Sequence, residues 1–100
     1  MKEADVQKWV QTKLKEAFAG DIYIFKVPQG QYTSRRGIPD LVAGIKGKFV
    51  GIEVKTDVGR LTKLQQLELD RIEAAGSASF VIHGKDESIM KIIIRRINEL

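Results

Sequence analysis

The sequence predicts an α/β fold, a small mixed β-sheet flanked by helices, with its elements in the order α-β-β-β-α-β-α. Three segments carry apolar residues at helical spacing, and four short segments are rich in β-branched and aromatic residues, which favour strands. The helical segment between the third and fourth strands is long enough to connect strands that lie parallel in one sheet. At 100 residues the chain has the length of one domain, which we expect to span residues 1–100.

The first helix is predicted over residues 3–18, where apolar side chains recur every four positions: Val6, Val10, Leu14 and Phe18. Gly20 ends it. Residues 22–27 form the first predicted strand, which Pro28 closes. The polar stretch at residues 29–39 is long for so small a domain, and such loops usually carry function.

Residues 40–45 and 49–55 are the second and third predicted strands. The glycine and lysines at residues 46–48 indicate a tight turn, so these two strands should form a hairpin. A helix over residues 62–75 and a strand over residues 78–83 follow.

The final helix begins after Asp86, whose side chain suits an N-cap. Apolar residues occupy much of its circumference: Ile89, Met90, Ile92, Ile93, Ile94 and Ile97. One small sheet cannot cover all of them, so we expect an exposed apolar band that forms a protein interface, and a two-fold homodimer is the commonest closed assembly. The alternative is a core helix buried on two sides.

The composition restricts the chemistry. The chain has no cysteine, which excludes disulfides, thiolate zinc sites and thiol nucleophiles, and its single histidine, His83, excludes a two-histidine metal site on one chain. A bound metal would depend on carboxylates, which hold hard ions such as Mg²⁺, Mn²⁺ or Ca²⁺. His83 ends a predicted strand and is expected to be structural. The net charge of +4 permits a polyanionic partner without requiring one.

No apolar run approaches the roughly 20 residues that a membrane span needs. The first residues also lack the apolar stretch of a signal peptide. We therefore expect a soluble, cytoplasmic protein with no membrane partner and no small-molecule cofactor.

The third predicted strand carries a carboxylate and an amine on one face. Strand alternation places Glu53 and Lys55 together with Gly51, opposite an apolar face. Their Cα atoms should lie roughly 6.6 Å apart, so both side chains can address one small site. A solvated strand face with an incidental ion pair is the alternative interpretation.

Asp40 is the second carboxylate. It follows Pro39 and begins the strand that should pair with the third, so a hairpin closed around Gly47 can bring it beside Glu53. The alternative is a turn residue after proline. Two carboxylates can hold a hard cation, which polarises a phosphoryl oxygen and lowers the pKa of a bound water, and Lys55 can orient that water. Together these residues indicate phosphodiester hydrolysis.

Four segments at these spacings resemble the VRR-NUC branch of the PD-(D/E)XK nuclease superfamily, over nearly the whole chain. They are a helix bearing Glu3, then Gly37-Ile38-Pro39-Asp40-Leu41, then Gly51-Ile52-Glu53-Val54-Lys55-Thr56, and Gly59-Arg60-Leu61-Thr62 leading to Gln65. The resemblance implies a restriction-endonuclease-like core. The chain departs from the family's pattern at residues 62–64, where a proline and an acid often occur, and this difference concerns helix capping more than chemistry.

The resemblance also implies roles for individual residues. Asp40 and Glu53 would bind Mg²⁺ or Mn²⁺ together with the carbonyl of Val54, and Lys55 would be the catalytic lysine. Two accessory residues would lie beside the site: Glu3 and Gln65.

Helical spacing supports both accessory residues. Glu3 continues the buried stripe of the first helix, although it would also complement the charge of the helix N-terminus. Gln65 lies on the inward stripe of the second helix, although it would also complete a capping box with Thr62. Both alternatives stay open at this point.

Contacts to nucleic acid are expected from the polar loop and from the segment after the third strand: Tyr32, Arg35, Arg36 and Arg60. These side chains suit phosphates, so we expect recognition of DNA shape, with a solvated loop as the alternative. The chain resembles standalone VRR-NUC domains, and this resemblance implies a homodimer that cleaves branched DNA such as a four-way (Holliday) junction.

The sequence therefore predicts a divalent-metal-dependent DNA endonuclease that selects DNA by its structure. The main alternative is a catalytically silent DNA-binding module on the same fold, although such a module has no need of Asp40, Glu53 and Lys55 together. An enzyme that acts on RNA is a third interpretation, but no run of aromatic residues marks a platform for stacking single strands.

Overall fold

The computed structural model describes residues 2–28 and 36–100, which form three helices and four strands in the predicted order. The helices are α1 (Glu3–Ala17), α2 (Lys63–Ala74) and α3 (Glu87–Asn98), and the strands are β1 (Ile22–Lys26), β2 (Leu41–Ile45), β3 (Lys48–Lys55) and β4 (Ala78–His83). The predicted α/β order is confirmed, and the predicted ends differ from these by one residue at most. Within the described ranges, no helix is long and apolar enough to cross a membrane.

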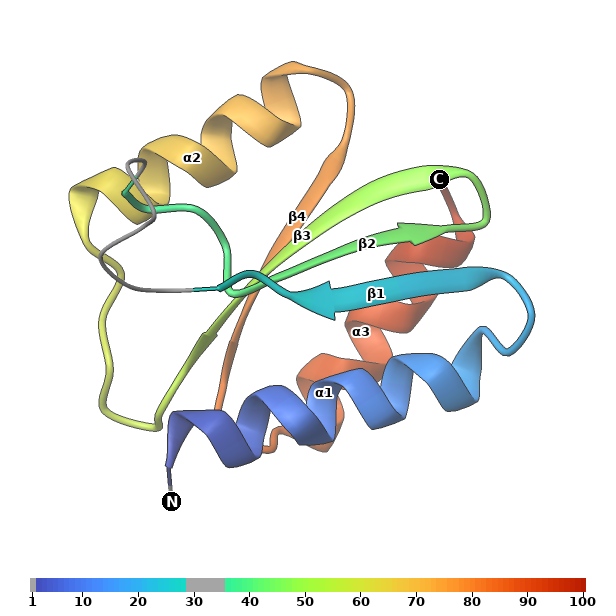
Figure 1. Ribbon diagram of the computed structural model, residues 1–100, viewed down its shortest axis with the longest axis horizontal. Coiled ribbons are helices and arrows are strands. Elements are labelled where there is room, and N and C mark those ends of the chain that lie inside the picture. Colours follow the sequence, from blue (N-terminus) through green and yellow to red (C-terminus); the bar gives the residue numbers. More distant parts are fainter. Residues whose placement is uncertain (1, 29–35) are drawn as a thin grey trace.

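The strands form one mixed sheet in the order β1-β2-β3-β4 (Figure 1). β1 pairs antiparallel with β2, β2 pairs antiparallel with β3, and β3 pairs parallel with β4. α2 is therefore the crossover that the sequence predicted between parallel strands. β1 and β4 are the edge strands of this sheet.

A two-residue turn joins β2 to β3 and fixes their register. Lys46 and Gly47 have φ of 52° and 81°, the positive values that a tight hairpin turn requires. The turn aligns Leu41 with Ile52 at the far end of the hairpin. Because successive side chains point to opposite faces of a sheet, this register decides which residues of the two strands meet.

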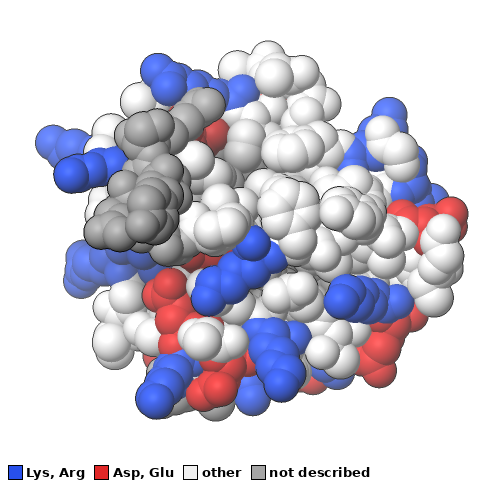
Figure 2. All heavy atoms as spheres, viewed as in Figure 1, with Lys and Arg blue, Asp and Glu red and all other residues white. Residues whose placement is uncertain are grey.

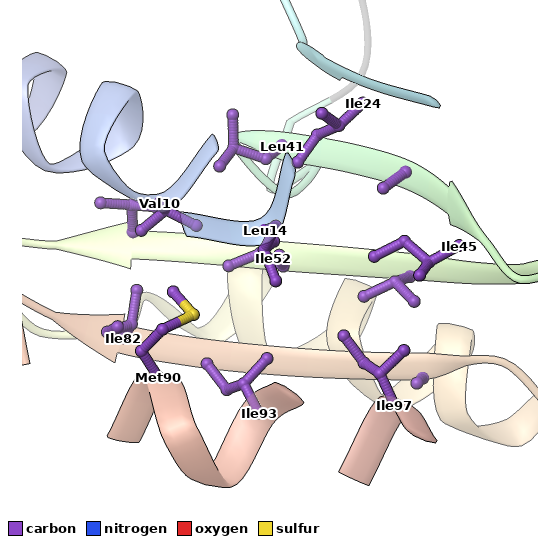
Figure 3. Packing of buried hydrophobic residues seen from close by; sticks show 14 of the residues in the cluster. Val10, Leu14, Ile24, Leu41, Ile45, Ile52, Ile82, Met90, Ile93 and Ile97 are labelled. Carbon is purple, nitrogen blue, oxygen red and sulfur yellow. The ribbon is translucent and has the colours of Figure 1, made fainter. Parts of the chain in front are cut away.

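α1 and α3 cover one face of the sheet, and the hydrophobic core lies between them and the strands (Figure 3). α1 contacts β1 and β3, α3 contacts β4, and the two helices contact each other. The residues most deeply buried there come from both helices and from the strands: Val6, Val10, Leu14, Leu41, Ile45, Val50, Ile52, Val54, Ile82, Met90, Ile93 and Ile97. Burial of each such side chain contributes about 1.5–3 kcal/mol, so this layer is the main source of stability.

α2 covers part of the opposite face, along β3 and β4. Gly51 on β3 marks a close approach, because a Cβ atom there would lie 2.8 Å from Ile72 Cδ1 of α2 and 3.2 Å from Pro39 Cγ. The missing side chain lets α2 and the segment around Pro39 pack directly against β3.

The expectation that α3 exposes a broad apolar band is wrong. Five of its six apolar residues are buried or pack against the core: Ile89, Met90, Ile93, Ile94 and Ile97. Ile92 is the exposed one, at 38%. α3 lies against both the sheet and α1. These two neighbours together cover the apolar residues that the sheet alone could not cover.

Gly51→Ala should destabilise the protein by about 0.5–1.5 kcal/mol, because the new methyl group displaces the end of the Ile72 side chain from its preferred conformation and presses on Pro39. The matched control is Gly44→Ala in β2, where a Cβ would meet nothing within 4 Å and stability should be unchanged or slightly raised. Urea denaturation followed by circular dichroism measures both. Equal stability of the two variants would contradict the close approach of α2.

Candidate active site

Asp40 and Glu53 lie side by side on the face that α2 partly covers. The pairing of Leu41 with Ile52 continues by one residue to bring Asp40 opposite Glu53, and opposite residues of antiparallel strands project to the same face. Their carboxyl groups are within hydrogen-bonding reach. The two residues are only 7% and 1% exposed, so the structure holds two acids together away from bulk water.

Backbone amides hold Asp40 in place, although it lies just outside β2. Its carbonyl oxygen accepts the N–H of Val27 at 2.8 Å, and its Oδ2 accepts the N–H of Val54, also at 2.8 Å. The N–H and C=O of a strand residue point to the same side of the strand. The carbonyl of Val54 therefore faces the side of β3 on which Asp40 lies.

Glu53 contacts an amine and an amide through one of its oxygens. Oε2 lies 3.6 Å from Lys55 Nζ and accepts a hydrogen bond of 3.2 Å from Gln65 Nε2. Oε1 is buried and accepts no hydrogen bond from an N–H or O–H group of the residues that the structure describes. Because a buried carboxylate oxygen without a partner is costly, this atom is suited to bind a cation or a proton.

The pKa of Glu53 is raised from 4.5 to about 8, first by burial and then by the charge of Asp40. A hydrogen bond to Asp40, which only the protonated form of Glu53 can donate, raises the pKa as well. The charge of Lys55 lowers it, and the charge of Glu3 raises it. In the absence of a cation, Glu53 is therefore mainly protonated at neutral pH.

Gln65 makes both sets of contacts that the sequence left open. Its Oε1 accepts the N–H of Thr62 at 2.9 Å, and its own N–H donates to Thr62 Oγ1 at 3.1 Å, which completes a capping box at the start of α2. Because Oε1 is engaged in the cap, Nε2 is directed to Glu53 Oε2. The helix cap thus orients the amide that contacts the buried acid.

The other predicted site residues are less closely placed. Glu3, half-buried at the start of α1, is near enough for its charge to affect Glu53. Arg36 and Arg60 are exposed, in the segments that precede β2 and α2. His83 is exposed, and its Nδ1 lies 3.2 Å from a main-chain oxygen. Two predicted contacts to nucleic acid lie outside the described residues: Tyr32 and Arg35.

Two features of α2 and its contacts were not anticipated. Glu68 of α2 is buried, at 6% exposure, and pairs with Arg71 at 3.3 Å. The helical spacing that directs Gln65 inward extends to Glu68, so this signal was present in the sequence. Gly37, with φ of 82°, packs so closely on α2 that a Cβ would lie 2.6 Å from the carbonyl oxygen of Leu64. No sequence pattern indicates that contact.

The donor atoms fit a hard divalent cation. Within residues 2–28 and 36–100, no group of three or more histidine, cysteine, aspartate or glutamate side chains is placed to share an ion. The available donors are therefore the carboxylates of Asp40 and Glu53 with the carbonyl of Val54, all of them oxygen atoms. Mg²⁺ is commonly held by one or two carboxylates, with water and substrate phosphate as its other ligands. The unpartnered Oε1 of Glu53 is consistent with such a site.

The raised pKa of Glu53 should make the metal-free protein less stable as pH rises. The unfolded chain releases this proton near pH 4.5 and the folded chain near pH 8, so stability from protonated Glu53 is lost progressively between these values. Glu53→Gln removes this dependence and should exceed the wild type in stability above pH 8. Urea denaturation in EDTA at a series of pH values measures the difference.

The matched control for this experiment is Glu16→Gln, which alters an exposed carboxyl group of α1. It should keep the pH dependence of the wild type. Parallel pH profiles for the wild type and Glu53→Gln would rule out a raised pKa at this residue.

Comparisons with known proteins identify the family and agree with the fold. The family model of the VRR-NUC domain matches residues 3–86. A solved structure described as a VRR-NUC domain protein has a TM-score of 0.74 at 23% identity, over 98% of this chain and 89% of its own. Another, described as a VRR-NUC domain, has a TM-score of 0.68 at 24% identity, over 97% and 94%. No curated protein matches the chain. Because the family match covers most of the chain, the protein belongs to the VRR-NUC family of nuclease domains.

Proposed function

We propose that the protein is a divalent-metal-dependent DNA endonuclease that hydrolyses phosphodiester bonds. Membership of a nuclease family supports a nuclease-like activity, with DNA as the class of substrate. One observation carries the finer proposal: Asp40 and Glu53 form a buried pair beside Lys55, and Oε1 of Glu53 accepts no hydrogen bond from an N–H or O–H group in the described structure. A module that only binds DNA has no use for two buried acids held together against their mutual repulsion.

Asp40, Glu53 and the carbonyl of Val54 would hold Mg²⁺ or Mn²⁺. When bound, the cation supplies positive charge that polarises a phosphoryl oxygen and lowers the pKa of a water molecule. The positive charge of the cation would favour the ionised form of Glu53, because it would offset the burial and the charge of Asp40 that raise the pKa of this residue. The N–H of Val54 keeps the Asp40 carboxylate oriented throughout.

Lys55 supplies positive charge from the protein. Its Nζ lies 3.6 Å from Glu53 Oε2, and its side chain is only 12% exposed, so the ammonium group is largely removed from bulk solvent. From this position it orients the attacking water and stabilises negative charge that develops on the phosphate. Gln65 donates to the same oxygen and restrains the Glu53 side chain.

Basic side chains near the start of α2 support binding to DNA. Arg36, Arg60 and Lys63 are exposed there, and such residues contact phosphates in preference to base edges. We therefore propose selection by DNA shape. We also propose a homodimer, because two active sites in a two-fold assembly can address two strands of a branched or four-way junction.

Asp40→Asn and Lys55→Ala should each lower the rate of Mn²⁺-dependent cleavage by about 10²-fold or more, because each removes a charge that acts on the reacting phosphate. Asparagine at position 40 retains an oxygen that can accept the N–H of Val54, so the fold should persist. Each protein is incubated with four-way, flap, single-stranded and duplex DNA, in Mn²⁺ or EDTA, and the products are resolved on denaturing gels.

Lys91→Ala, which removes an exposed charge from α3, is the control and should cleave like the wild type. Circular dichroism checks that every variant is folded. Binding of DNA without product in any metal would favour the catalytically silent module. Cleavage that persists in EDTA would contradict the dependence on metal.

Gln65→Leu should lower cleavage by about 10- to 100-fold, because Glu53 loses the donor that restrains it. The adjacent Gln66 bonds instead to Asp70 at 2.9 Å, so Gln66→Leu is the matched control and should cleave normally. Gln65→Glu separates the two contacts, because glutamate accepts the N–H of Thr62 but has no donor for Glu53. Thermal denaturation and the cleavage assay together measure the result. If Gln65→Glu had both the stability and the cleavage rate of the wild type, capping of α2 would be the only role of Gln65.

A further inference from the structure

A tight turn follows β3 directly after Lys55. It is formed by residues 56–59, which we call the lysine turn, and the N–H of Gly59 donates to the carbonyl oxygen of Thr56 at 3.1 Å. The two central residues add little to the core, because Asp57 is exposed and Val58 is 88% exposed. Burial of these side chains therefore does not explain why the chain is held in this conformation.

Contacts with the end of β4 fix the start of the lysine turn. The N–H of Gly84 donates to the carbonyl oxygen of Lys55 at 2.8 Å, and His83 Nδ1 lies 3.2 Å from the carbonyl oxygen of Thr56. A carbonyl oxygen can only accept, so Nδ1 is the donor in this contact. Asp57 packs so closely on Gly84 that a Cβ atom there would overlap its carboxyl group. The backbone that leaves Lys55 is thus tied to β4.

At its other end, the lysine turn packs against the side chain of Lys55. A Cβ atom added to Gly59 would lie 3.3 Å from Lys55 Cβ, 3.4 Å from Lys55 Cδ and 3.2 Å from Thr56 Oγ1. The φ of Gly59 is not positive, so a left-handed conformation is not the reason for a glycine at this position. The position instead requires the absence of a side chain, which lets the backbone of the turn lie against the lysine.

We propose that Gly59 is a positioning residue for Lys55: the lysine turn holds the alkyl chain of this residue so that its ammonium group stays beside Glu53. The proposal rests on the proposed function, in which Lys55 acts on the attacking water and the phosphate. Lysine carries its charge on a flexible four-carbon chain, so an unrestrained ammonium group would occupy many positions. A reacting group is most effective when its neighbours hold it in the productive position.

The contacts of the ammonium group show why a restraint on the alkyl chain is needed. Lys55 Nζ lies 3.6 Å from Glu53 Oε2, which is longer than the roughly 2.7–3.2 Å of a directed hydrogen bond. This ion pair therefore does not fix the direction of the side chain by itself. Gln65 restrains the Glu53 side chain through its hydrogen bond of 3.2 Å, and Gly59 restrains Lys55 from the same connection between β3 and α2.

Contact with DNA is the other role that the lysine turn could have. Figure 2 shows basic groups along the side of the molecule where α2 begins, and the exposed Arg60 directly follows the turn. A contact with DNA would depend on the exposed side chain of Val58, whereas positioning depends on Gly59, which lies against Lys55. Substitutions at these two neighbouring residues therefore separate the two roles.

Gly59→Ala tests the proposal, because the new methyl group requires the Lys55 side chain to move by a few tenths of an ångström. In Mn²⁺-dependent cleavage, kcat should fall by about 3- to 10-fold with KM unchanged, since a displacement of about 1 Å can cost about 10²-fold. The matched control is Val58→Ala, which lies in the same turn and should cleave like the wild type. Thermal denaturation verifies that both variants are folded.

The reactivity of Lys55 toward acetic anhydride tests the restraint without DNA or metal. Each protein is treated with a limiting amount of the reagent in EDTA, and mass spectrometry compares acetylation of Lys55 with that of the exposed Lys48. The Lys55 side chain is only 12% exposed, so it should react slowly in the wild type and in Val58→Ala. It should react several-fold faster in Gly59→Ala, whereas acetylation of Lys48 should be the same in all three proteins.

Two further variants complete the experiment. His83→Ala removes the donor to Thr56 from an exposed position, so the protein should fold and Lys55 should again react faster. In the Lys55→Ala background, Gly59→Ala should cause no further loss of cleavage, because both changes act through one side chain.

Unchanged acetylation of Lys55 in both Gly59→Ala and His83→Ala would overturn the proposal. So would a loss of cleavage in Val58→Ala that equals the loss in Gly59→Ala, because this result would assign the lysine turn to contact with DNA. A wild type that cleaves no DNA would defeat the proposed function alone, since the acetylation rates would still decide whether Gly59 restrains Lys55.

Discussion

The two-residue turn at Lys46 and Gly47 is the constraint on which the candidate site depends. It closes the hairpin so that pairing runs from the turn to Leu41 and Ile52, and the next residue on each strand is a carboxylate. A slip of one residue would send the side chains of one strand to the other face, which would separate the acids and expose the core. Because core residues and acids alternate along the same strands, the hydrophobic core enforces the geometry of the acid pair.

Holding the two acids there has a cost, which the raised pKa of Glu53 expresses. The N–H of Val54, the ammonium group of Lys55 and the amide of Gln65 offset part of this cost. One oxygen of Glu53 still accepts no hydrogen bond from an N–H or O–H group in the described structure. A strongly perturbed buried acid with specific charged neighbours is typical of functional sites, since stability alone would favour an apolar pair. The arrangement is consistent with the proposed role, in which a cation would take the place of the proton on Glu53.

The distribution of three helices over a four-stranded sheet explains why one face of the sheet is buried and part of the other is exposed. α1 and α3 pack side by side on one face and bury it, while α2 alone lies on the other, over β3 and β4. A sheet face needs a covering layer to bury its apolar side chains. The part that α2 does not reach carries Tyr23, Phe25 and Phe49, which are exposed.

The sequence by itself determined the order and bounds of the elements, the face shared by Glu53 and Lys55, and the family, because periodicity, turn chemistry and motif spacing are local properties. It placed Asp40 beside Glu53 only on the condition that the turn closed at Gly47. Tertiary structure decided the rest. The burial of α3 depended on α1 lying beside it, and the double contact of Gln65 depended on how α2 docks on β3. Phe49 shares a surface with Tyr23 and Phe25 only because the strands pair in this register, since Phe49 is far from both in the sequence.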